Sequence, residues 1–450
     1  MSRFVHFIEQ LQSYAPQLCM EGDGPSYTYA ELLEEIESWQ ARFDELSIAP
    51  GSVVGLRADY SLSAVAALLA LFARRAIVAL IPRDRGAVHY LVDARAAALL
   101  ELNVEGSYRW RSVPHPTRHP LLNRLSTASE GGVVIFTSGS TGRPKAALQS
   151  LERFLYKFRR PGRRLRTLAF LLFDHVGGLD TLLYTLASGG TLIFTRQRDP
   201  GSILELIESH RVEVLPTSPS FLRLLCVAGD HREHDLSSLK IITYGSEPMD
   251  PTTLARVNAR FPNAQISQKY GTTETGSPRS VSRSNDSLWI KIKNDGVETK
   301  VVDDVLWIRS EGTILGYLNA PSPVDEQGWY CTGDLVDVDG EWIRFRGRAG
   351  DTINVGGEKV APTEVEQSIL ELDFVRDAVV SGEPHALMGQ IVAARVALTT
   401  AALDPKKAVE RIRMHCRERL APYKVPVRVD IVAEGFANDR QKAQRKRASD

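Results

Sequence analysis

The chain has few cysteines, no net charge and no long apolar run, and each absence argues against a class of protein. Its four cysteines, among 450 residues, are far apart and form no CxxC pair, so we expect a reduced, cytoplasmic protein without structural zinc. The 55 basic and 55 acidic residues cancel, which argues against a general nucleic-acid or membrane-surface binder. No apolar run approaches the roughly 20 residues of a membrane span, and the N-terminus shows no signal-peptide core.

What the chain does have is a long alternation of strand and helix patterns. Thr28 lies three residues before Glu31, a capping-box pattern that opens the helical spacing of residues 27–46. Strands are expected at 53–56, 76–81, 133–135, 168–173, 191–194 and 212–216, and helices at 61–72, 181–187 and 203–209. This alternation predicts parallel sheets covered by helices.

The pattern changes after about residue 288. Short β-type segments occur at 289–292, 299–302 and 305–309, and a smaller unit follows Arg348. That unit has expected helices at 363–372 and 408–420 and strands at 375–380 and 391–397. The predicted fold is therefore α/β: a large N-terminal region, residues 1–349, and a small α+β C-terminal domain, residues 351–450.

A loop rich in hydroxyl groups and glycine follows the strand expected at 133–135. It comprises Thr137, Ser138, Gly139, Ser140, Thr141, Gly142, Arg143, Pro144 and Lys145. Backbone N–H groups and hydroxyls of such a loop can donate to phosphate oxygens, and the lysine adds a positive charge. The loop lacks the GxxxxGK[ST] spacing of a P-loop. An ordinary surface turn needs only two or three such residues, so we interpret the loop as a phosphate site.

The loop resembles the signature of the adenylate-forming superfamily, which includes acyl-CoA and aryl-CoA synthetases, luciferases and nonribosomal-peptide adenylation domains. In that family the loop covers the β- and γ-phosphates of ATP. Three later segments resemble further family motifs, for adenine, for phosphate with Mg²⁺, and for ribose. They are Tyr244-Gly245-Ser246-Glu247-Pro248, Tyr270-Gly271-Thr272-Thr273-Glu274 and Tyr330-Cys331-Thr332-Gly333-Asp334-Leu335. The resemblance also implies two βα sheets and a small barrel-like part in the N-terminal region, and a mobile C-terminal domain.

The resemblance implies a role for individual residues of these motifs. Tyr270 would pack on adenine, as aromatic faces do on bases, and Thr273 would contact the α-phosphate. Glu274 would help to hold Mg²⁺, which prefers carboxylate and phosphate oxygens. Asp334 would accept hydrogen bonds from the ribose hydroxyls, with Arg348 close by. If the family resemblance is set aside, the same segments are interpreted as turns, one of them capped by Asp334.

The C-terminal part of the resemblance concerns a hinge, a glycine pair and a lysine. Gly350 lies at the family's hinge, where Asp or Lys is usual, and glycine permits the same rotation. Gly356 and Gly357 would line the path of a pantetheine thiol, or form a plain turn before a helix. Lys442 corresponds to the catalytic lysine that neutralises the carboxylate and α-phosphate. Gln441 replaces the usual preceding glycine, and a solvated charged tail is the competing interpretation.

The expected acyl pocket begins after residue 172. His175 lies at the family's aromatic or histidine gate, and Val176 lies where amino-acid-activating members carry an aspartate. Val176 cannot pair with an α-ammonium group, so we expect an aryl or a small to medium acyl acid. A shift of one or two residues would put Asp174 there and reverse the conclusion, and the histidine could instead be a core residue. The pocket is predicted to contain His175, Val176, Gly177, Tyr244 and Gly245.

Together the motifs predict an ATP- and Mg²⁺-dependent acid–thiol ligase. It would form acyl-AMP and pyrophosphate from a carboxylic acid, then transfer the acyl group to a thiol, most readily that of CoA. The phosphopantetheine of a carrier protein, or an amine, is the alternative acceptor. A non-catalytic nucleotide-binding homologue is a rival. A nucleic-acid arm at residues 440–447 is a distant third, because no binding motif accompanies it.

A basic cluster precedes the acyl-pocket segment. Its members are Lys157, Arg159, Arg160, Arg163, Arg164 and Arg166. A solvated face is the simpler interpretation. A docking site for CoA phosphates or for an acidic carrier protein is the alternative.

Overall fold

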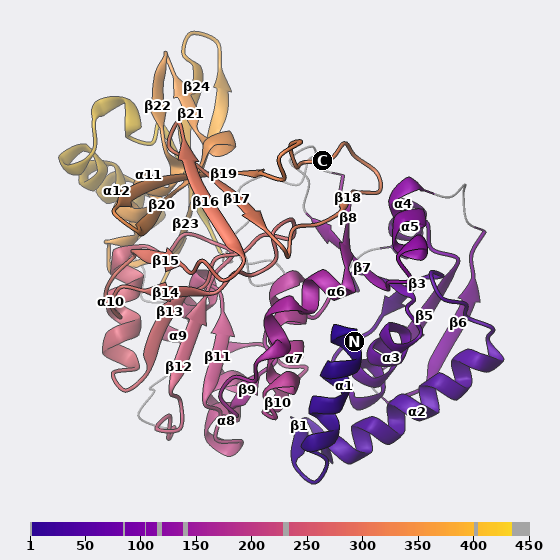
Figure 1. The fold of residues 1–450 in the computed structure, drawn as a ribbon. Coiled ribbons are helices and arrows are strands. Elements are labelled where there is room, and N and C mark those ends of the chain that lie inside the picture. Colours follow the sequence, from indigo (N-terminus) through magenta and orange to yellow (C-terminus); the bar gives the residue numbers. More distant parts are fainter. Residues whose placement is uncertain are drawn as a thin grey trace.

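The computed structural model describes residues 2–83, 86–103, 105–114, 119–137, 143–227, 234–399 and 404–433. Figure 1 shows two large sheets with helices packed between and around them, and two smaller sheets, of which only the last belongs to the C-terminal part. The largest hydrophobic cluster contains residues from both large sheets and from the helices between them, so these sheets share one core. Within the described ranges, no helix combines the length and the apolar character needed to cross a membrane.

The first large sheet has seven strands, of which four central ones run parallel. They are β3 (Val53–Arg57), β4 (Ile77–Leu80), β5 (Ala98–Leu102) and β7 (Gly132–Thr137), flanked by β6 (Tyr108–Ser112), β8 (Lys145–Ser150) and β18 (Gly316–Tyr317). The strand order is β18-β8-β7-β4-β3-β5-β6. Its helices are α2 (Tyr29–Glu45), α3 (Leu62–Ala73), α4 (Ala87–Ala94) and α5 (Pro120–Thr127). The predicted capping box is present at the start of α2.

The second large sheet also has seven strands, and all but its edge strand β2 are parallel. In the order β13-β12-β11-β9-β10-β1-β2 they are β13 (Gln265–Gln268), β12 (Ile241–Tyr244), β11 (Val214–Thr217), β9 (Arg166–Leu168), β10 (Thr191–Phe194), β1 (Leu18–Gly22) and β2 (Gly24–Thr28). The helices of this region are α1 (Arg3–Ser13), α6 (Leu151–Phe154), α7 (Val176–Ala187), α8 (Pro200–Ser209), α9 (Pro219–Val227) and α10 (Pro251–Arg260), with the 3₁₀ helix η1 (Leu155–Arg159).

Two smaller sheets complete the fold. The six-stranded antiparallel one has the order β14 (Ser280–Ser282), β15 (Ile290–Ile292), β20 (Trp342–Arg348), β19 (Tyr330–Asp339), β17 (Val305–Ser310) and β16 (Val297–Val302). The C-terminal one contains β21 (Ile353–Val355), β22 (Glu358–Val360), β23 (Val375–His385), β24 (Gly389–Leu398) and β25 (Arg428–Val432), covered by α11 (Pro362–Leu370) and α12 (Pro405–Arg419). The predicted mixed α/β fold, with a large N-terminal region and a smaller C-terminal part, is confirmed.

Most predicted elements are found, but the segment before the acyl pocket differs. The strand predicted at 168–173 ends at Leu168 in β9, and the helix predicted at 181–187 begins at Val176. Gly178 lies in the first turn of α7, where a Cβ atom would lie 1.9 Å from the carbonyl oxygen of Leu172. The glycine therefore permits a close approach of helix and loop.

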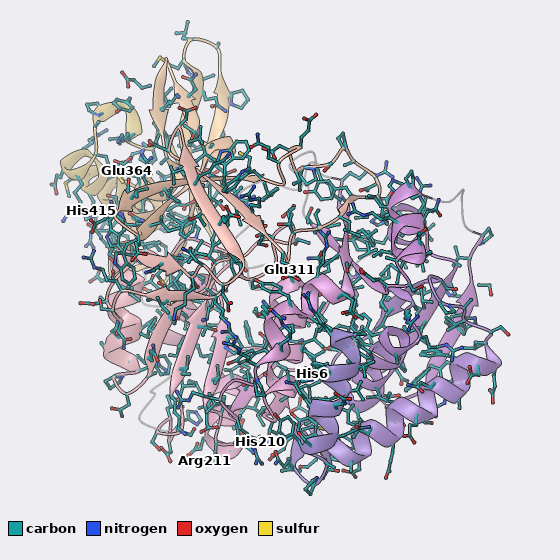
Figure 2. All side chains as sticks on the ribbon, viewed as in Figure 1. His6, His210, Arg211, Glu311, Glu364 and His415 are labelled. Atoms are coloured by element: carbon teal, nitrogen blue, oxygen red, sulfur yellow. The ribbon has the colours of Figure 1, made fainter. Side chains whose placement is uncertain are left out.

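Ion pairs join segments that are distant in sequence. Arg3 at the start of α1 pairs with Glu311, which follows β17 and is labelled in Figure 2, at 2.5 Å. Lys424 pairs with Glu364 of α11, also labelled there, at 2.7 Å. His210 contacts Glu21 of β1 at 2.8 Å. These contacts lie away from the predicted motifs, so we treat them as structural.

Candidate functional site

The predicted phosphate loop connects two neighbouring antiparallel strands. Thr137 is the last residue of β7 and pairs in register with Lys145, the first residue of β8. Ser138, Gly139, Ser140, Thr141 and Gly142 lie outside the described residues, so their predicted roles stay predictions. Beyond them, the Arg143 guanidinium pairs with the buried Asp93 at 2.6 Å, which ties the end of the loop to helix α4.

Glu274 lies at the centre of a buried group of polar side chains. Its Oε1 accepts a hydrogen bond of 2.5 Å from the hydroxyl of Tyr317 in β18, and its charge also acts on the nearby Tyr330 of β19. Burial and the adjacent carboxylate raise the pKa of both phenols, so they remain neutral donors. The Nζ of Lys145 lies 5.1 Å from the centre of the Tyr317 ring, a cation–π distance. The phosphate loop and the Glu274 motif therefore meet at Tyr317.

Asp334 lies next to this group and holds two donors. Its carboxylate accepts from the Tyr270 hydroxyl at 2.8 Å and from Nε of Arg348 at 3.0 Å. The register of β19 and β20 sets this pair, because Asp334 and Arg348 lie directly opposite each other. Burial raises the pKa of the Asp334 carboxyl despite the neighbouring guanidinium. A partly desolvated carboxylate with fixed donors is suited to accept further bonds from hydroxyl groups.

Tyr270 is packed on one face. Its ring stacks on Phe345 of β20 with centroids 4.6 Å apart and planes 10° apart. The predicted contact of Tyr270 with adenine remains a prediction, since Phe345 covers one face of the ring. Sequence reasoning missed both Phe345 and Tyr317; the alternation of large side chains in β20 could have indicated the first, and nothing in the sequence singled out the second.

The threonines of the same motif form a tight turn. Thr272 and Thr275 are buried, their hydroxyls lie 3.0 Å apart, and a bridge joins Thr272 to Gly276. A Cβ atom on Gly271 would lie 2.7 Å from the carbonyl oxygen of Gly276, so only glycine fits there. Thr273 lies in this turn with partial exposure, beside Glu274.

The predicted adenine-flanking loop follows β12. Ser246 has a φ of 71°, a left-handed conformation that is uncommon for residues other than glycine and is found more often at functional sites. Glu247 accepts from the hydroxyl of Ser220 at 2.7 Å and from its backbone N–H at 3.1 Å, and thereby ties the loop to α9. Pro248 follows. A Cβ atom on Gly245 would lie 2.6 Å from the carbonyl oxygen of Lys269.

The predicted acyl-pocket residues come from two elements. His175 is the N-cap residue of α7, and Val176 and Gly177 form its first turn, where Val176 packs against the shared core. Tyr244 ends β12, and its side chain is 1% exposed within a second hydrophobic cluster. Its backbone also contacts the residue before the Tyr270 motif, because the carbonyl oxygen of Tyr244 accepts from the Lys269 N–H at 2.7 Å.

The predicted hinge and glycine pair lie on the C-terminal side. Gly350 is exposed in the 3₁₀ helix η3 (Ala349–Asp351), and nothing lies within 4 Å of the position that a Cβ atom would take there. Gly356 and Gly357 form the turn of the β21–β22 hairpin, with φ values of 61° and 98° that favour glycine. Lys442 lies outside the described residues, so its catalytic role stays a prediction.

A buried arginine links α9 to the C-terminal sheet, and sequence reasoning did not anticipate it. Arg223 pairs with Asp250, the N-cap residue of α10, at 3.1 Å, and with Asp377 of β23 at 3.3 Å. All three side chains are buried. The link holds the C-terminal sheet against the helices that follow β11 and β12.

The basic cluster is only partly a solvated face. Lys157 is 10% exposed: it forms an ion pair with Asp180 of α7 and donates to the carbonyl oxygen of Ser277 at 2.7 Å. Arg166 pairs with Glu21 at 2.7 Å. The solvated-face interpretation is wrong for these two, because η1 and β9 direct them against other elements. It holds for the exposed residues Arg159, Arg160, Arg163 and Arg164.

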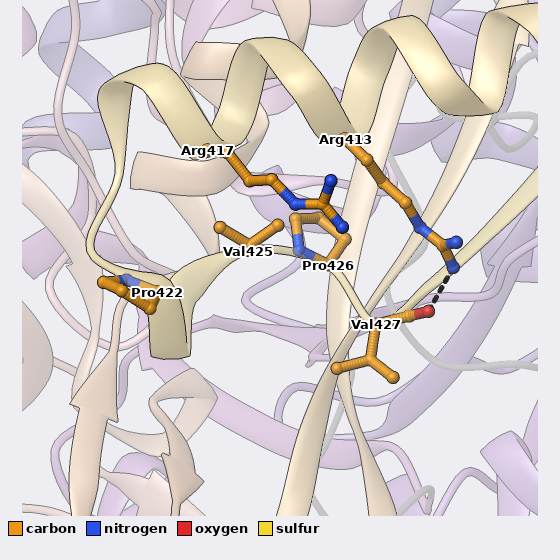
Figure 3. A pocket seen from close by; sticks show the side chains of 6 residues that line it. All are labelled: Arg413, Arg417, Pro422, Val425, Pro426 and Val427. Carbon is orange, nitrogen blue, oxygen red and sulfur yellow. Dashed lines mark hydrogen bonds between the residues drawn. The ribbon is translucent and has the colours of Figure 1, made fainter.

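A pocket of about 560 Å³ lies on the C-terminal part, away from all of these motifs. Figure 3 shows its lining: Arg413, Arg417, Pro422, Val425, Pro426 and Val427. Arg413 donates to the carbonyl oxygen of Val427. None of the predicted site residues contributes to it, so it gives no support to the predicted chemistry.

Glu274 is the residue to consider for a metal. Among the described residues, no group of three or more histidine, cysteine, aspartate or glutamate side chains could hold an ion. A single carboxylate beside the predicted phosphate loop nevertheless fits Mg²⁺, which uses one or two carboxylates together with the phosphates of a substrate.

Two family profiles match the chain. "AMP-binding enzyme" matches residues 7–318, and "AMP-binding enzyme C-terminal domain" matches residues 364–441. One curated relative, 3-[(3aS,4S,7aS)-7a-methyl-1,5-dioxo-octahydro-1H-inden-4-yl]propanoyl:CoA ligase of Mycobacterium tuberculosis, is 30% identical over 335 residues, 69% of this chain and 65% of that protein. The 2-succinylbenzoate–CoA ligase of Geobacillus sp. is 24% identical over 463 residues, 94% and 92% of the two chains. The match to the first relative thus spans less than two thirds of that protein's length.

Solved structures with the same fold cover nearly the whole chain. The anthranilate CoA ligase AuaEII in complex with anthranoyl-AMP has a TM-score of 0.83 at 21% identity, covering 99% of this chain and 96% of its own. The amide bond synthetase McbA from Marinactinospora thermotolerans has a TM-score of 0.80 at 24% identity, covering 98% of each chain. At these identities the likeness concerns the fold.

Proposed function

The chain belongs to the AMP-binding enzyme family, and from this premise we propose that it activates a carboxylic acid with ATP. One observation supports the proposal above all others. The motif at 270–274 bonds at one end to Asp334, through Tyr270, and at the other to Tyr317, through Glu274. Asp334, whose carboxylate is suited to ribose hydroxyls, is thus bonded to one end of this turn. Glu274, whose carboxylate is suited to a phosphate-bound cation, forms the other end, beside the phosphate loop.

In the proposed first step, a carboxylate oxygen of the acid attacks the α-phosphorus of ATP. The new oxygen–phosphorus bond replaces the bond to the bridging oxygen, giving acyl-AMP and releasing pyrophosphate. No protein nucleophile is needed, because positioning of the two reactants and neutralisation of the phosphate charges accelerate the reaction. Thr137, Ser138, Thr141 and Lys145 would hold the departing pyrophosphate, and Thr273 would bind the α-phosphate.

The nucleotide would be held by residues on both sides of this turn. Asp334 would accept from the ribose hydroxyls, with Arg348 fixing the orientation of its carboxylate. Tyr270 and the segment Gly245–Pro248 would flank the base. Glu274 would hold Mg²⁺, which when bound supplies positive charge to the phosphate oxygens. Tyr317 would orient the Glu274 carboxylate for that contact.

In the proposed second step, a thiol sulfur attacks the acyl carbon, the carbon–oxygen bond to phosphate breaks, and AMP leaves. We propose CoA as the acceptor, with the phosphopantetheine of a carrier protein or an amine as alternatives. The domains would divide at Gly350, residues 1–349 and 351–450, with rotation there withdrawing Lys442 and presenting Gly356 and Gly357 to the thiol. The four free cysteines suit the reducing conditions of the cytoplasm.

The acid would be an aryl or a small to medium acyl acid. Val176 packs its apolar side chain at the start of α7, and an α-ammonium group would find no charge on it. His175 and Gly177 would complete that side of the pocket, and Tyr244 and Gly245 the other. An α-amino acid is therefore disfavoured as a substrate.

The proposal is tested by screening carboxylic acids for ATP-dependent hydroxamate formation, followed by thioester assays with CoA and with a carrier protein offered separately. We expect acid-dependent pyrophosphate release and a CoA thioester. ATP binding without acid-dependent release would instead favour a non-catalytic homologue, and release without a CoA thioester would favour another acceptor. Lys442→Ala should slow adenylation far more than thioester formation from supplied acyl-AMP; equal slowing of both steps would contradict its assigned role.

A further inference from the structure

A group of charged side chains lies beside the predicted acyl pocket, and the proposed mechanism does not use it. It consists of Lys157, Asp180, Lys269, Arg279 and Lys293, and we call it the Lys269 cluster. Burial lowers the pKa of the Lys269 ammonium, and the positive charges of Lys157, Arg279 and Lys293 lower it further, against the attraction of Asp180. Direct contacts join four of the five residues: Arg279 donates to the Lys157 carbonyl oxygen at 3.4 Å, the Lys293 N–H donates to the Arg279 carbonyl oxygen at 2.8 Å, and Lys157 pairs with Asp180.

Lys269 is held between the nucleotide motif and the acyl-pocket residues. It follows β13 and directly precedes Tyr270. Its N–H donates to Tyr244 at 2.7 Å, and its carbonyl oxygen lies so close to Gly245 that no side chain fits there. The backbone at Lys269 is therefore fixed against two of the predicted pocket residues, and its side chain keeps exposed surface.

Asp180 links the cluster to the helix that begins at the predicted gate. It lies in α7, five residues after His175 and four after Val176, one helical turn from the predicted gate. Its carboxylate is already engaged by Lys157, whose ammonium also donates to Ser277 just after the nucleotide motif. The carboxylate of Asp180 therefore pairs with Lys157 and not with Lys269.

The cluster contains more positive charge than its carboxylates balance. Arg279 pairs with Asp295 at 3.4 Å, and Lys157 with Asp180. In the part of the chain that the structure describes, neither Lys269 nor Lys293 has a carboxylate within 4 Å. Like charges held together destabilise a site unless an anion joins them.

We propose that the acid activated by this chain carries a second carboxylate, and that Lys269 pairs with it at the far end of the acyl pocket from the α-phosphate. The inference rests on the proposed function, because it assumes that the first carboxylate is adenylated. A second carboxylate on the acid would account for the lysine that directly precedes the nucleotide motif and contacts the backbone of Tyr244 and Gly245. Its side chain would then select among acids without contacting the reacting atoms.

The test uses non-hydrolysable acyl-sulfamoyl adenosines, which imitate acyl-AMP and need no turnover. Two matched pairs differ only in a terminal carboxylate: hexanoyl against 5-carboxypentanoyl, and benzoyl against 3-carboxybenzoyl. Calorimetry on the full chain gives the ratio of Kd values within each pair. A charge-assisted hydrogen bond predicts a preference for the carboxylated member of about tenfold or more in at least one pair.

Variants assign that preference to one residue. Lys269→Met keeps the length of the side chain without its charge, and should bring the ratio to about one, whereas Lys269→Arg should restore much of it. Lys291→Met is the matched control, because Lys291 is a partly exposed lysine of β15 that pairs with Glu341 at 2.6 Å. Its ratio should equal that of the unmodified chain.

Two results would overturn the inference: no preference in the unmodified chain, or a preference that survives in Lys269→Met. The proposed function is judged separately by the same titrations. If the uncharged analogues and AMP bind but no preference appears, adenylate binding stands and only the second carboxylate is refuted. If neither AMP nor any analogue binds, the proposed function itself fails and the inference fails with it.

Discussion

Replacing Asp334 by asparagine should separate nucleotide affinity from stability. The substitution keeps the shape of the side chain and an oxygen that can accept from the Tyr270 hydroxyl, now at 2.8 Å. It removes the charge that would strengthen bonds from the ribose hydroxyls. Since hydrogen bonds to a charged group contribute about 1.5–3 kcal/mol each, loss of one should weaken AMP binding by about 10-fold to 150-fold.

Stability should change much less. The Arg348 side chain is 59% exposed, so its pair with Asp334 is screened and contributes at most about 1 kcal/mol. Burial also raises the pKa of Asp334, which means that the folded state accommodates the negative charge at a cost that asparagine does not have. The free energy of unfolding should therefore fall by no more than about 1 kcal/mol.

Calorimetric titration with AMP and urea denaturation measure the two quantities. Asp337→Asn is the control, because Asp337 lies three residues further along β19 and pairs with Arg344 at 2.7 Å, outside the proposed site. It should leave AMP affinity unchanged. An Asp334→Asn variant that binds AMP within twofold of the unmodified chain would refute the ribose assignment, and one that loses more than about 3 kcal/mol of stability would refute the structural argument.

Three further predictions concern neighbouring groups. Tyr317→Phe removes a donor to Glu274 and should reduce acid-dependent pyrophosphate release by about tenfold, an effect that raised Mg²⁺ should not fully restore. Arg223→Met leaves two buried carboxylates without their cation and should lower the free energy of unfolding by about 3–5 kcal/mol in urea denaturation; a loss below about 1 kcal/mol would show that the link contributes little. AMP affinity should fall on acidification at a higher pH than an ordinary aspartate would give, because the raised pKa of Asp334 lets the carboxylate protonate earlier. That acid-side loss should be absent in Asp334→Asn.

The pH effect on stability has the opposite direction. A carboxyl whose pKa is higher in the folded than in the unfolded chain binds its proton more tightly when folded. The contribution of Asp334 to stability is therefore largest below its unfolded pKa and declines as the pH rises through the folded pKa. Comparing urea denaturation of the unmodified chain and Asp334→Asn across that range measures it.

Local patterns in the sequence predicted local structure well. The capping box at Thr28 and Glu31 opens α2, and the strands expected at 53–56 and 191–194 are present as β3 and β10, because side-chain periodicity and caps act over a few residues. The strand expected at 168–173 ends at Leu168, and α7 begins at Val176, five residues before the predicted start of the helix. The close approach of Gly178 to Leu172 is a tertiary contact, which side-chain periodicity does not encode.

The contacts that assemble the candidate site could not be predicted in the same way. The register of β19 and β20 places Arg348 opposite Asp334, and Arg223 meets Asp377 across 154 positions of sequence. Tyr317 reaches Glu274 from 43 positions away. Motif resemblance could name the carboxylates, but their partners depend on how separate sheets pack, which no single segment specifies.

The bond between Tyr317 and Glu274 also has a consequence for mutational sensitivity. Tyr317 sits at the margin of the first sheet, next to Asn319, whose amide accepts from Ala146 N–H and donates to the Pro144 carbonyl oxygen, both at 2.9 Å. That amide clamps the strand carrying the phenol to the two residues around Lys145. A substitution at Asn319 would then make the orientation of the Glu274 carboxylate less well defined. The rate of adenylation should fall by the same factor for every acid, because Asn319 would not contact the acyl group.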